Sequence, residues 1–160
     1  MAAAIFYQLW LGWRAEDLPF SPKKLDLFVT HKSIGVLLLV FVVLRLGSRF
    51  MTGVPPHTGG VNRLEKRAAE AGHWILYALM VAVPLSGWVV SDTSRIPFRL
   101  FKQFSVPNLM APDKSISDFA ADVHGVLTTA LAIVLVIHVA AALRHHFLLR
   151  NNTLKRMLPW

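Results

Sequence analysis

Four histidines lie in one long apolar stretch near the C-terminal end of the chain. Residues 122–147 read DVHGVLTTALAIVLVIHVAAALRHHF and carry His124, His138, His145 and His146. Ionisable side chains inside a membrane span are costly and are by default a sign of function. On a helix, the fourteen residues from His124 to His138 place both rings within roughly 40° of one face and about 21 Å apart along the axis. The spacing predicts two stacked sites, one near each membrane surface.

A fifth histidine, His31, stands near the start of another apolar stretch, residues 25–50. In a four-span chain the second and fourth spans run in the same direction, so His31 and His124 enter from one side and can face each other. Two neutral imidazoles on facing helices are a common way for a helical bundle to hold haem iron. Because both axial positions are then filled, such a haem carries electrons and does not bind oxygen.

The alternative is that each ring belongs to the membrane interface, where amphipathic rings are common. His138 weighs against this interpretation, because it lies among apolar and small residues and a buried imidazole needs a ligand or a polar partner. The candidate partners are His73 or a histidine on the front half of the first span. A zinc site fits poorly, because the chain has no Cys and no two histidines four residues apart.

The composition favours a membrane protein. Hydrophobic residues make up 54% of the 160 residues, above the roughly 45–50% of soluble domains. The absence of Cys excludes disulfides, iron–sulfur clusters and a thioether-attached haem, so nitrogen or oxygen must hold any metal. The net charge of +8 does not indicate nucleic-acid binding, because the Lys and Arg residues flank apolar runs and form no basic patch with interleaved aromatics.

Four apolar segments predict an all-α, integral-membrane four-helix bundle that forms a single transmembrane domain over 1–160. They are residues 1–13, 25–50, 71–91 and 118–149. A span needs about 20 residues, and the last three segments qualify. The first reaches only about 20 Å as a helix, against a hydrocarbon core of about 30 Å. We expect it to be the second half of a span that starts before Met1. An interfacial anchor or a signal peptide is the alternative, although a basic n-region is absent.

The connecting segments carry Pro and polar residues typical of loops. We expect the 51–70 loop and the tail 150–160 in the cytoplasm, since their side carries the larger net positive charge, and 14–24 and 92–114 outside. Within the last loop, RIPFRLFKQF alternates basic and apolar residues, which predicts a short helix lying on the membrane surface.

Taken together, these segments resemble the bacterial cytochrome b561 family, four-helix membrane cytochromes with two b-type haems. The resemblance covers the chain from Met1, and its motifs keep the family's order and spacing. The matching stretches are LFVTHKSIGVLLLVFVVLRL, AGHWILYALMVAVPLSGW, VPNLMAPDK, DVHGVLTTALAIVLVIHVAAALRHHF and NNTLKRMLP.

The resemblance implies a ligand set. It assigns the outer haem to His31 and His124, and the inner haem to His138 with a histidine of a His-Trp pair near the start of span one. That histidine has no counterpart in this sequence. Three interpretations stay open: the chain starts inside span one, the inner iron has five ligands, or His73 substitutes.

Two further residues have expected roles at inner depth. Arg45 lies fourteen residues after His31, on nearly the same face, and is predicted to pair with an inner-haem propionate or to act as a snorkelling anchor. His73, with Trp74 and Tyr77 nearby, lines an inner quinone pocket or belongs to the aromatic belt.

The function expected from this resemblance is electron transfer in the bacterial cytoplasmic (inner) membrane. Electrons pass between a quinone and a periplasmic or surface redox partner, which includes superoxide, so the chain could act as a quinone-linked oxidoreductase. One alternative is a haem-bearing anchor subunit of a hydrogenase or dehydrogenase, docked through loop 92–114. An alternative of another class is a haem-free transporter or proton relay that uses the intramembrane histidines. The oligomeric state stays open, and a homodimer is one option.

Overall fold

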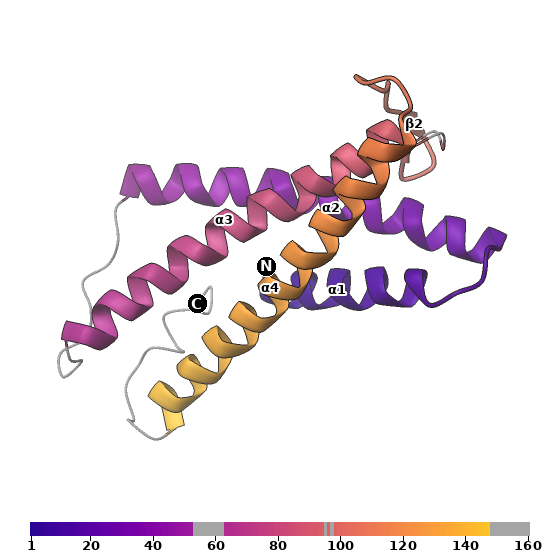
Figure 1. Cartoon of the computed structure of the whole chain (residues 1–160). Coiled ribbons are helices and arrows are strands. Elements are labelled where there is room, and N and C mark those ends of the chain that lie inside the picture. The colour runs from indigo at the N-terminus through magenta and orange to yellow at the C-terminus, as the bar shows by residue number, and fades with distance from the viewer. Residues whose placement is uncertain (53–62, 95, 97, 148–160) are drawn as a thin grey trace.

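The computed structural model describes residues 1–52, 63–94, 96 and 98–147. Three of its helices are long and apolar enough to cross a membrane, and a shorter helix precedes them (Figure 1). The prediction of an all-α membrane bundle is therefore confirmed, apart from one small hairpin. The elements are α1 (Ala2–Glu16), α2 (Pro22–Thr52), α3 (Arg63–Thr93), β1 (Arg99–Leu100), β2 (Phe104–Ser105) and α4 (Lys114–Phe147).

The observed helices differ in extent from the predicted spans. The third begins at residue 63, eight residues before the predicted 71, because the charged stretch ahead of the apolar run continues the helix. The first helix has 15 residues, fewer than a span needs. Residues 53–62 of the predicted 51–70 loop, residues 148–149 of the last span and the tail 150–160 lie outside the described residues. Residues 51–52 and 63–70, also predicted as loop, belong instead to the ends of the two neighbouring helices.

The helices form two antiparallel pairs that cross each other (Figure 1). α1 packs against the first half of α2, and α3 packs against α4. A contact between α2 and α3 joins the two pairs. This arrangement brings the first half of α2 close to the end of α3 and the start of α4, where the histidines predicted for the outer site lie.

Local sequence signals explain where the long helices begin. Pro22 occupies the first position of α2, where its missing N–H costs no hydrogen bond. The hydroxyl of Ser21 accepts a hydrogen bond from the backbone N–H of Lys24 at 3.3 Å, as a helix cap does. Asp113 caps α4 in the same way, by accepting from the N–H of Ile116 at 3.1 Å. Pro84 lies inside α3, which membrane helices tolerate.

The buried core lies at the middle of the bundle, where α1, α3 and α4 meet. Its side chains are Ile5 and Leu9 of α1, Leu76 of α3, and Leu131 and Leu135 of α4. Large apolar side chains elsewhere on the long helices point outward, including Val43, Val126 and Ile137, which are 57%, 70% and 62% exposed. Such a surface suits lipid and would be a liability in water.

The segment between α3 and α4 forms an antiparallel hairpin, so the predicted surface helix over residues 95–104 is wrong in the residues described there. β1 and β2 pair through Arg99 with Ser105 and Leu100 with Phe104. Phe101 and Lys102 form the turn with φ of 48° and 63°. Alternation of basic and apolar residues has the period of a strand, which is why this pattern fits a hairpin better than a helix.

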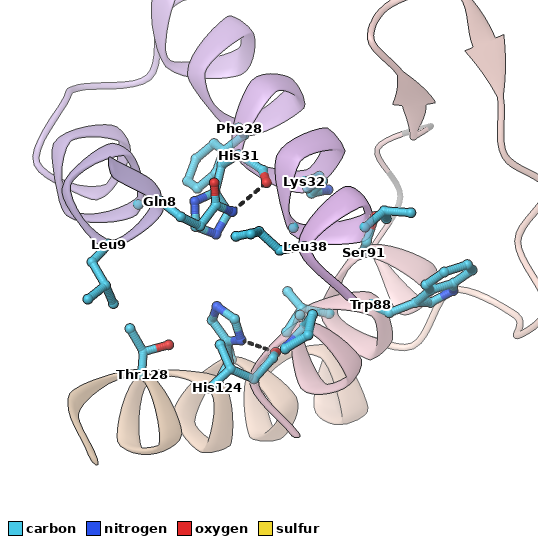
Figure 2. A pocket seen from close by; sticks show the side chains of 18 of the residues that line it. Gln8, Leu9, Phe28, His31, Lys32, Leu38, Trp88, Ser91, His124 and Thr128 are labelled. Atoms are coloured by element: carbon cyan, nitrogen blue, oxygen red, sulfur yellow. Dashed lines mark hydrogen bonds between the residues drawn. The ribbon is translucent and has the colours of Figure 1, made fainter. Parts of the chain in front are cut away.

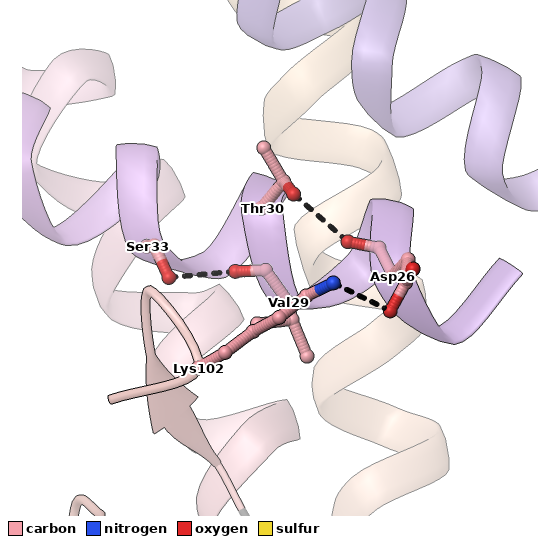
Figure 3. A network of polar contacts seen from close by, with 5 residues as sticks. All are labelled: Asp26, Val29, Thr30, Ser33 and Lys102. Carbon is pink, nitrogen blue, oxygen red and sulfur yellow. Dashed lines mark hydrogen bonds and ion pairs between the residues drawn. The ribbon is translucent and has the colours of Figure 1, made fainter. Parts of the chain in front are cut away.

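The hairpin turn is docked onto α2 (Figure 3). The fully buried Ser33 donates its hydroxyl to the carbonyl of Val29 at 2.7 Å and accepts the backbone N–H of Phe101 at 2.8 Å. The ammonium of Lys102 lies 3.0 Å from the carboxylate of Asp26. These contacts hold the hairpin beside the end of α2 that carries His31.

Asp92, at the end of α3, organises the rest of this connection. Its side chain is only 4% exposed, and its two carboxylate oxygens accept the backbone N–H groups of Leu109 and Met110, each at 2.8 Å. The side-chain amide of Asn108 donates to the Asp92 carbonyl at 2.8 Å. A buried carboxylate satisfied in this way fixes the loop across the end of the bundle.

Candidate functional site

The structure brings the rings of His31 of α2 and His124 of α4 close together, one edge-on to the other. Their ring centroids lie 6.3 Å apart, with the ring planes at 89° (Figure 2). A metal ion between two imidazole nitrogens, with bonds of about 2 Å to each, requires ring centroids roughly 6 Å apart. The spacing of this pair, which we call the outer pair, therefore suits two axial ligands of one metal ion without movement of the helices.

Each ring of the outer pair lies against a glycine of the preceding helix. A Cβ added at Gly12 of α1 would come 2.9 Å from Cε1 of His31, and one added at Gly87 of α3 would come 3.0 Å from Cε1 of His124. The first distance is shorter than Cβ contacts show, and the second is so tight that the His124 ring would have to shift by a few tenths of an ångström. The absence of a side chain at these two positions lets the imidazoles sit between the helices.

Hydrogen bonds fix the orientation of His124. Its Nδ1 lies 3.0 Å from the carbonyl oxygen of Val83 and 3.0 Å from the hydroxyl of Ser86. A carbonyl oxygen can only accept, so Nδ1 carries the proton and donates it. Nε2 is then left with a free lone pair, which is the form of imidazole that binds a metal.

His31 is held through its backbone. The side-chain amide of Gln8 donates to the His31 carbonyl at 2.6 Å. Within the described residues, Nδ1 of His31 and Oε1 of Gln8 are both buried without a hydrogen-bond partner. A buried ring nitrogen without a protein partner is unusual and fits a side chain that takes part in ligand binding.

A cavity of about 480 Å³ opens around the outer pair, between all four helices and the segment that follows α3 (Figure 2). This volume lies in the range of cofactor and small-molecule sites. Its walls are mainly apolar, with few polar groups. The lining includes Leu9, Trp13, Phe28, Lys32, Val36, Met80, Pro84, Trp88, Phe98 and Thr128. Two imidazoles converging in an apolar slot between helices fit a b-type haem.

A second histidine pair, the inner pair, lies at the other end of the α3/α4 pair. His73 of α3 and His138 of α4 have ring centroids 5.4 Å apart and planes at 64°. Both residues are half-buried. This is closer than the roughly 6 Å that an ion between two imidazoles needs, so the rings would have to separate slightly to admit a metal. His138 thus meets His73, which the sequence offered as one of its candidate partners.

The aromatic residues beside the inner pair bind an arginine. The guanidinium of Arg49 lies 5.4 Å from the ring centroids of both Trp74 and Tyr77, a cation–π arrangement. Arg45, the predicted propionate partner, is one turn earlier on α2 and is exposed. Its role stays a prediction, and Arg49 was not singled out in the sequence because aromatic contacts across helices leave no local pattern.

Two further histidines stand at the C-terminal end of α4. His145 and His146 are in the last turn of α4, and the ring of His146 packs on Phe147 with centroids 4.9 Å apart. Among the described residues, no group of three or more His, Cys, Asp or Glu side chains is placed to hold a metal ion. His57 lies outside the described part of the chain.

The sequence could have indicated the two glycines but not their function. Gly12 and Gly87 each stand in an apolar helix, where glycine is unfavourable and often marks a close approach. Which side chain approaches depends on how α1 and α3 cross their neighbours, and the sequence does not supply that.

Several known proteins are similar to this chain in sequence. The sequence model of the family described as "Prokaryotic cytochrome b561" matches residues 1–160. The chain is 37% identical over 128 residues to "Cytochrome b561 homolog 2" of Escherichia coli (strain K12), covering 80% of this chain and 68% of the relative. It is 28% identical over 155 residues to "Probable superoxide oxidase CybB" of Yersinia pestis, covering 93% and 86%. Identity to "Cytochrome b561 homolog 1" of Escherichia coli (strain K12) is 27% over 130 residues, covering 81% and 73%.

Proposed function

Because the chain belongs to the prokaryotic cytochrome b561 family, and is thus a multi-pass b-type cytochrome of the bacterial inner membrane, we propose that it carries electrons between a quinone and a redox partner at the outer surface. In this proposal His31 and His124 hold the outer haem. The observation that carries it is the outer pair itself, with ring centroids 6.3 Å apart in a cavity between helices.

A haem held by His31 and His124 would supply one-electron chemistry at its iron. The chain's own residues supply ligation and environment. The Val83 carbonyl and the Ser86 hydroxyl keep the proton of His124 on Nδ1, so that Nε2 faces the cavity as a ligand. Apolar side chains around the pair exclude water from the site.

We propose that His73 and His138 hold a second haem at inner depth. The offset of fourteen positions from His124 to His138 separates the two sites by about 21 Å along α4. The buried cluster around Leu76, Leu131 and Leu135 lies between them and joins the helices that carry both pairs. Such a stack would let electrons cross much of the bilayer.

The outer redox partner that we propose is superoxide, which the name of the Yersinia pestis relative suggests. Two superoxide ions each give up one electron and leave as dioxygen. Two electrons and two protons then convert one quinone to its quinol. The chain would connect these half-reactions and would not itself be consumed.

This function is tested by following quinone reduction in liposomes that contain the purified chain and ubiquinone. Superoxide is generated outside by xanthine oxidase, and the quinol formed is measured with and without superoxide dismutase. We expect quinol formation that dismutase abolishes and that is absent in His124→Ala. A haem that is reduced by quinol but never by superoxide would reject superoxide and favour a membrane-anchor role. A chain with no haem would reject the cytochrome function and favour a haem-free transporter.

A further inference from the structure

Lys32 is a positive charge in the wall of the outer cavity. It follows His31 on α2, is half-buried, and lines the cavity (Figure 2). Its ammonium lies 5.9 Å from the ring centroid of Phe98, a buried residue that also lines the cavity. In the described part of the chain it is the one Lys or Arg that lines this cavity.

Within the described residues, no carboxylate forms an ion pair with this ammonium. All nine Asp and Glu residues lie in the described ranges, and the ion pairs found there join Lys102 to Asp26, Lys114 to Asp118 and Arg144 to Glu65. Two acidic residues also line the cavity. Asp92 uses both oxygens to bind loop N–H groups, and Glu16 is exposed and lies beyond 4.0 Å of the ammonium.

A half-buried cation without a counter-charge is costly, and an anionic ligand removes that cost. A lysine that served only as a membrane anchor would extend its ammonium into water. Lys32 instead directs it over an aromatic ring in the cavity wall. The Lys32 ammonium would bind an anionic group, and the imidazoles of the outer pair would bind a metal. Together they predict a ligand that carries both.

We propose that Lys32 binds a propionate carboxylate of the haem held between His31 and His124. This assignment rests on the proposed function, because it requires haem at the outer pair. A charge-assisted hydrogen bond from the ammonium would fix the rotation of the haem about the axis that joins the two ligands. In this assignment Lys32 is a cofactor-binding residue.

The test compares haem with its dimethyl ester, which has the same ring and iron but no negative charge. Full-length apoprotein in detergent is titrated with each, and His124→Ala defines the outer-site fraction. We expect the wild type to bind haem about tenfold more tightly than the ester, the size of one hydrogen bond to a charged group. In Lys32→Met this preference should disappear, while the affinity for the ester stays that of the wild type.

Matched variants make the result specific. Lys32→Arg keeps the cation and should keep the preference. Lys114→Met removes one charge at the same end of the bundle, outside the cavity, and should keep it as well. Ester binding reports folding, and Lys32→Gln replaces the Met variant if that variant fails to bind the ester.

Three outcomes would overturn the assignment. An unchanged preference in Lys32→Met and Lys32→Gln would mean that the ammonium does not bind the propionate. If the preference for haem is unchanged in these variants but superoxide reduces their haem more slowly than in the wild type, Lys32 binds superoxide as a free oxyanion instead. A wild type that binds neither haem nor ester at the outer pair would reject the proposed function and this assignment with it.

Discussion

The two histidine pairs differ in how completely their surroundings are built. The outer pair has rings 6.3 Å apart, a glycine beneath each ring, a hydrogen bond that sets the proton of His124, and a cavity around it. The inner pair has rings 5.4 Å apart among aromatic side chains. The neighbouring Gly72 faces open space, with nothing within 4 Å of an added Cβ.

This difference shows that two histidines at the right depth do not by themselves make a preorganised site. Preorganisation requires space for the cofactor, a fixed imidazole tautomer and support for each ring. In the outer pair, His124 meets all three requirements: it borders the cavity, its Nδ1 is hydrogen-bonded, and its ring rests on Gly87. We therefore expect the outer site to bind haem more tightly than the inner site.

The largest expected effect comes from removing one ring of the outer pair. His124→Ala and His31→Ala should each lose the outer haem, because one remaining imidazole cannot hold the iron from both sides. The ratio of haem to protein, measured after purification, should fall by about one. His145→Ala removes a ring from the same helix outside both pairs and should retain the wild-type ratio. Equal haem content in all three variants would remove the distinction between the outer pair and other histidines.

Removing the inner pair should have a smaller effect on total haem. His73→Ala and His138→Ala should each lose a second, more weakly bound haem and leave the outer haem unchanged. The inner rings must separate to admit a metal. In the wild type, the inner site should therefore lose its haem before the outer site does when the detergent solution is diluted. Haem content and spectra are measured along a dilution series. If His138→Ala loses haem and His73→Ala does not, His73 is not the inner ligand.

The glycines test the geometry of the outer pair more finely. Gly87→Ala places a Cβ about 3.0 Å from the His124 ring and should displace it. Overpacking of this kind typically costs about 1–3 kcal/mol, so the affinity for haem should drop roughly tenfold or more. Gly12→Ala should act similarly through His31.

Gly72→Ala is the matched control, since it makes the same substitution in the same helix beside the inner pair. It should leave haem affinity unchanged or slightly stabilise α3, because alanine favours a helix. Loss of haem in Gly72→Ala as large as in Gly87→Ala would show that helix flexibility, and not ring contact, is the cause.

The smallest expected effect is that of Ser86→Ala. The hydroxyl lies 3.0 Å from Nδ1 of His124, but the Val83 carbonyl lies at the same distance and still accepts the proton. A single neutral hydrogen bond contributes about 0.5–1.5 kcal/mol, so haem affinity should fall by less than about tenfold. The midpoint potential of the outer haem should shift while that of the inner haem does not. A complete loss of outer haem would mean that Ser86, and not Val83, holds the ring.

The sequence was sufficient for the fold class and for the position of the outer pair. Apolar length predicts spans, and helix geometry places His31 and His124 at one depth. It was insufficient where helix crossing decides the contact, as for Gly12 against His31. The predicted surface helix over 95–104 was wrong at residues 99–104. Alternating basic and apolar residues do not by themselves show that a hairpin forms, and the contact of Phe101 with Ser33 that holds it is long-range.

The central claim is that His31 and His124 hold one haem between them. Low-temperature electron paramagnetic resonance of the oxidised, purified chain tests it most directly, with His138→Ala used to remove the inner haem. The account predicts a low-spin ferric signal of the bis-imidazole type in His138→Ala, lost on further replacement of His124. A high-spin ferric signal, or a low-spin signal that survives the loss of His124, would contradict it.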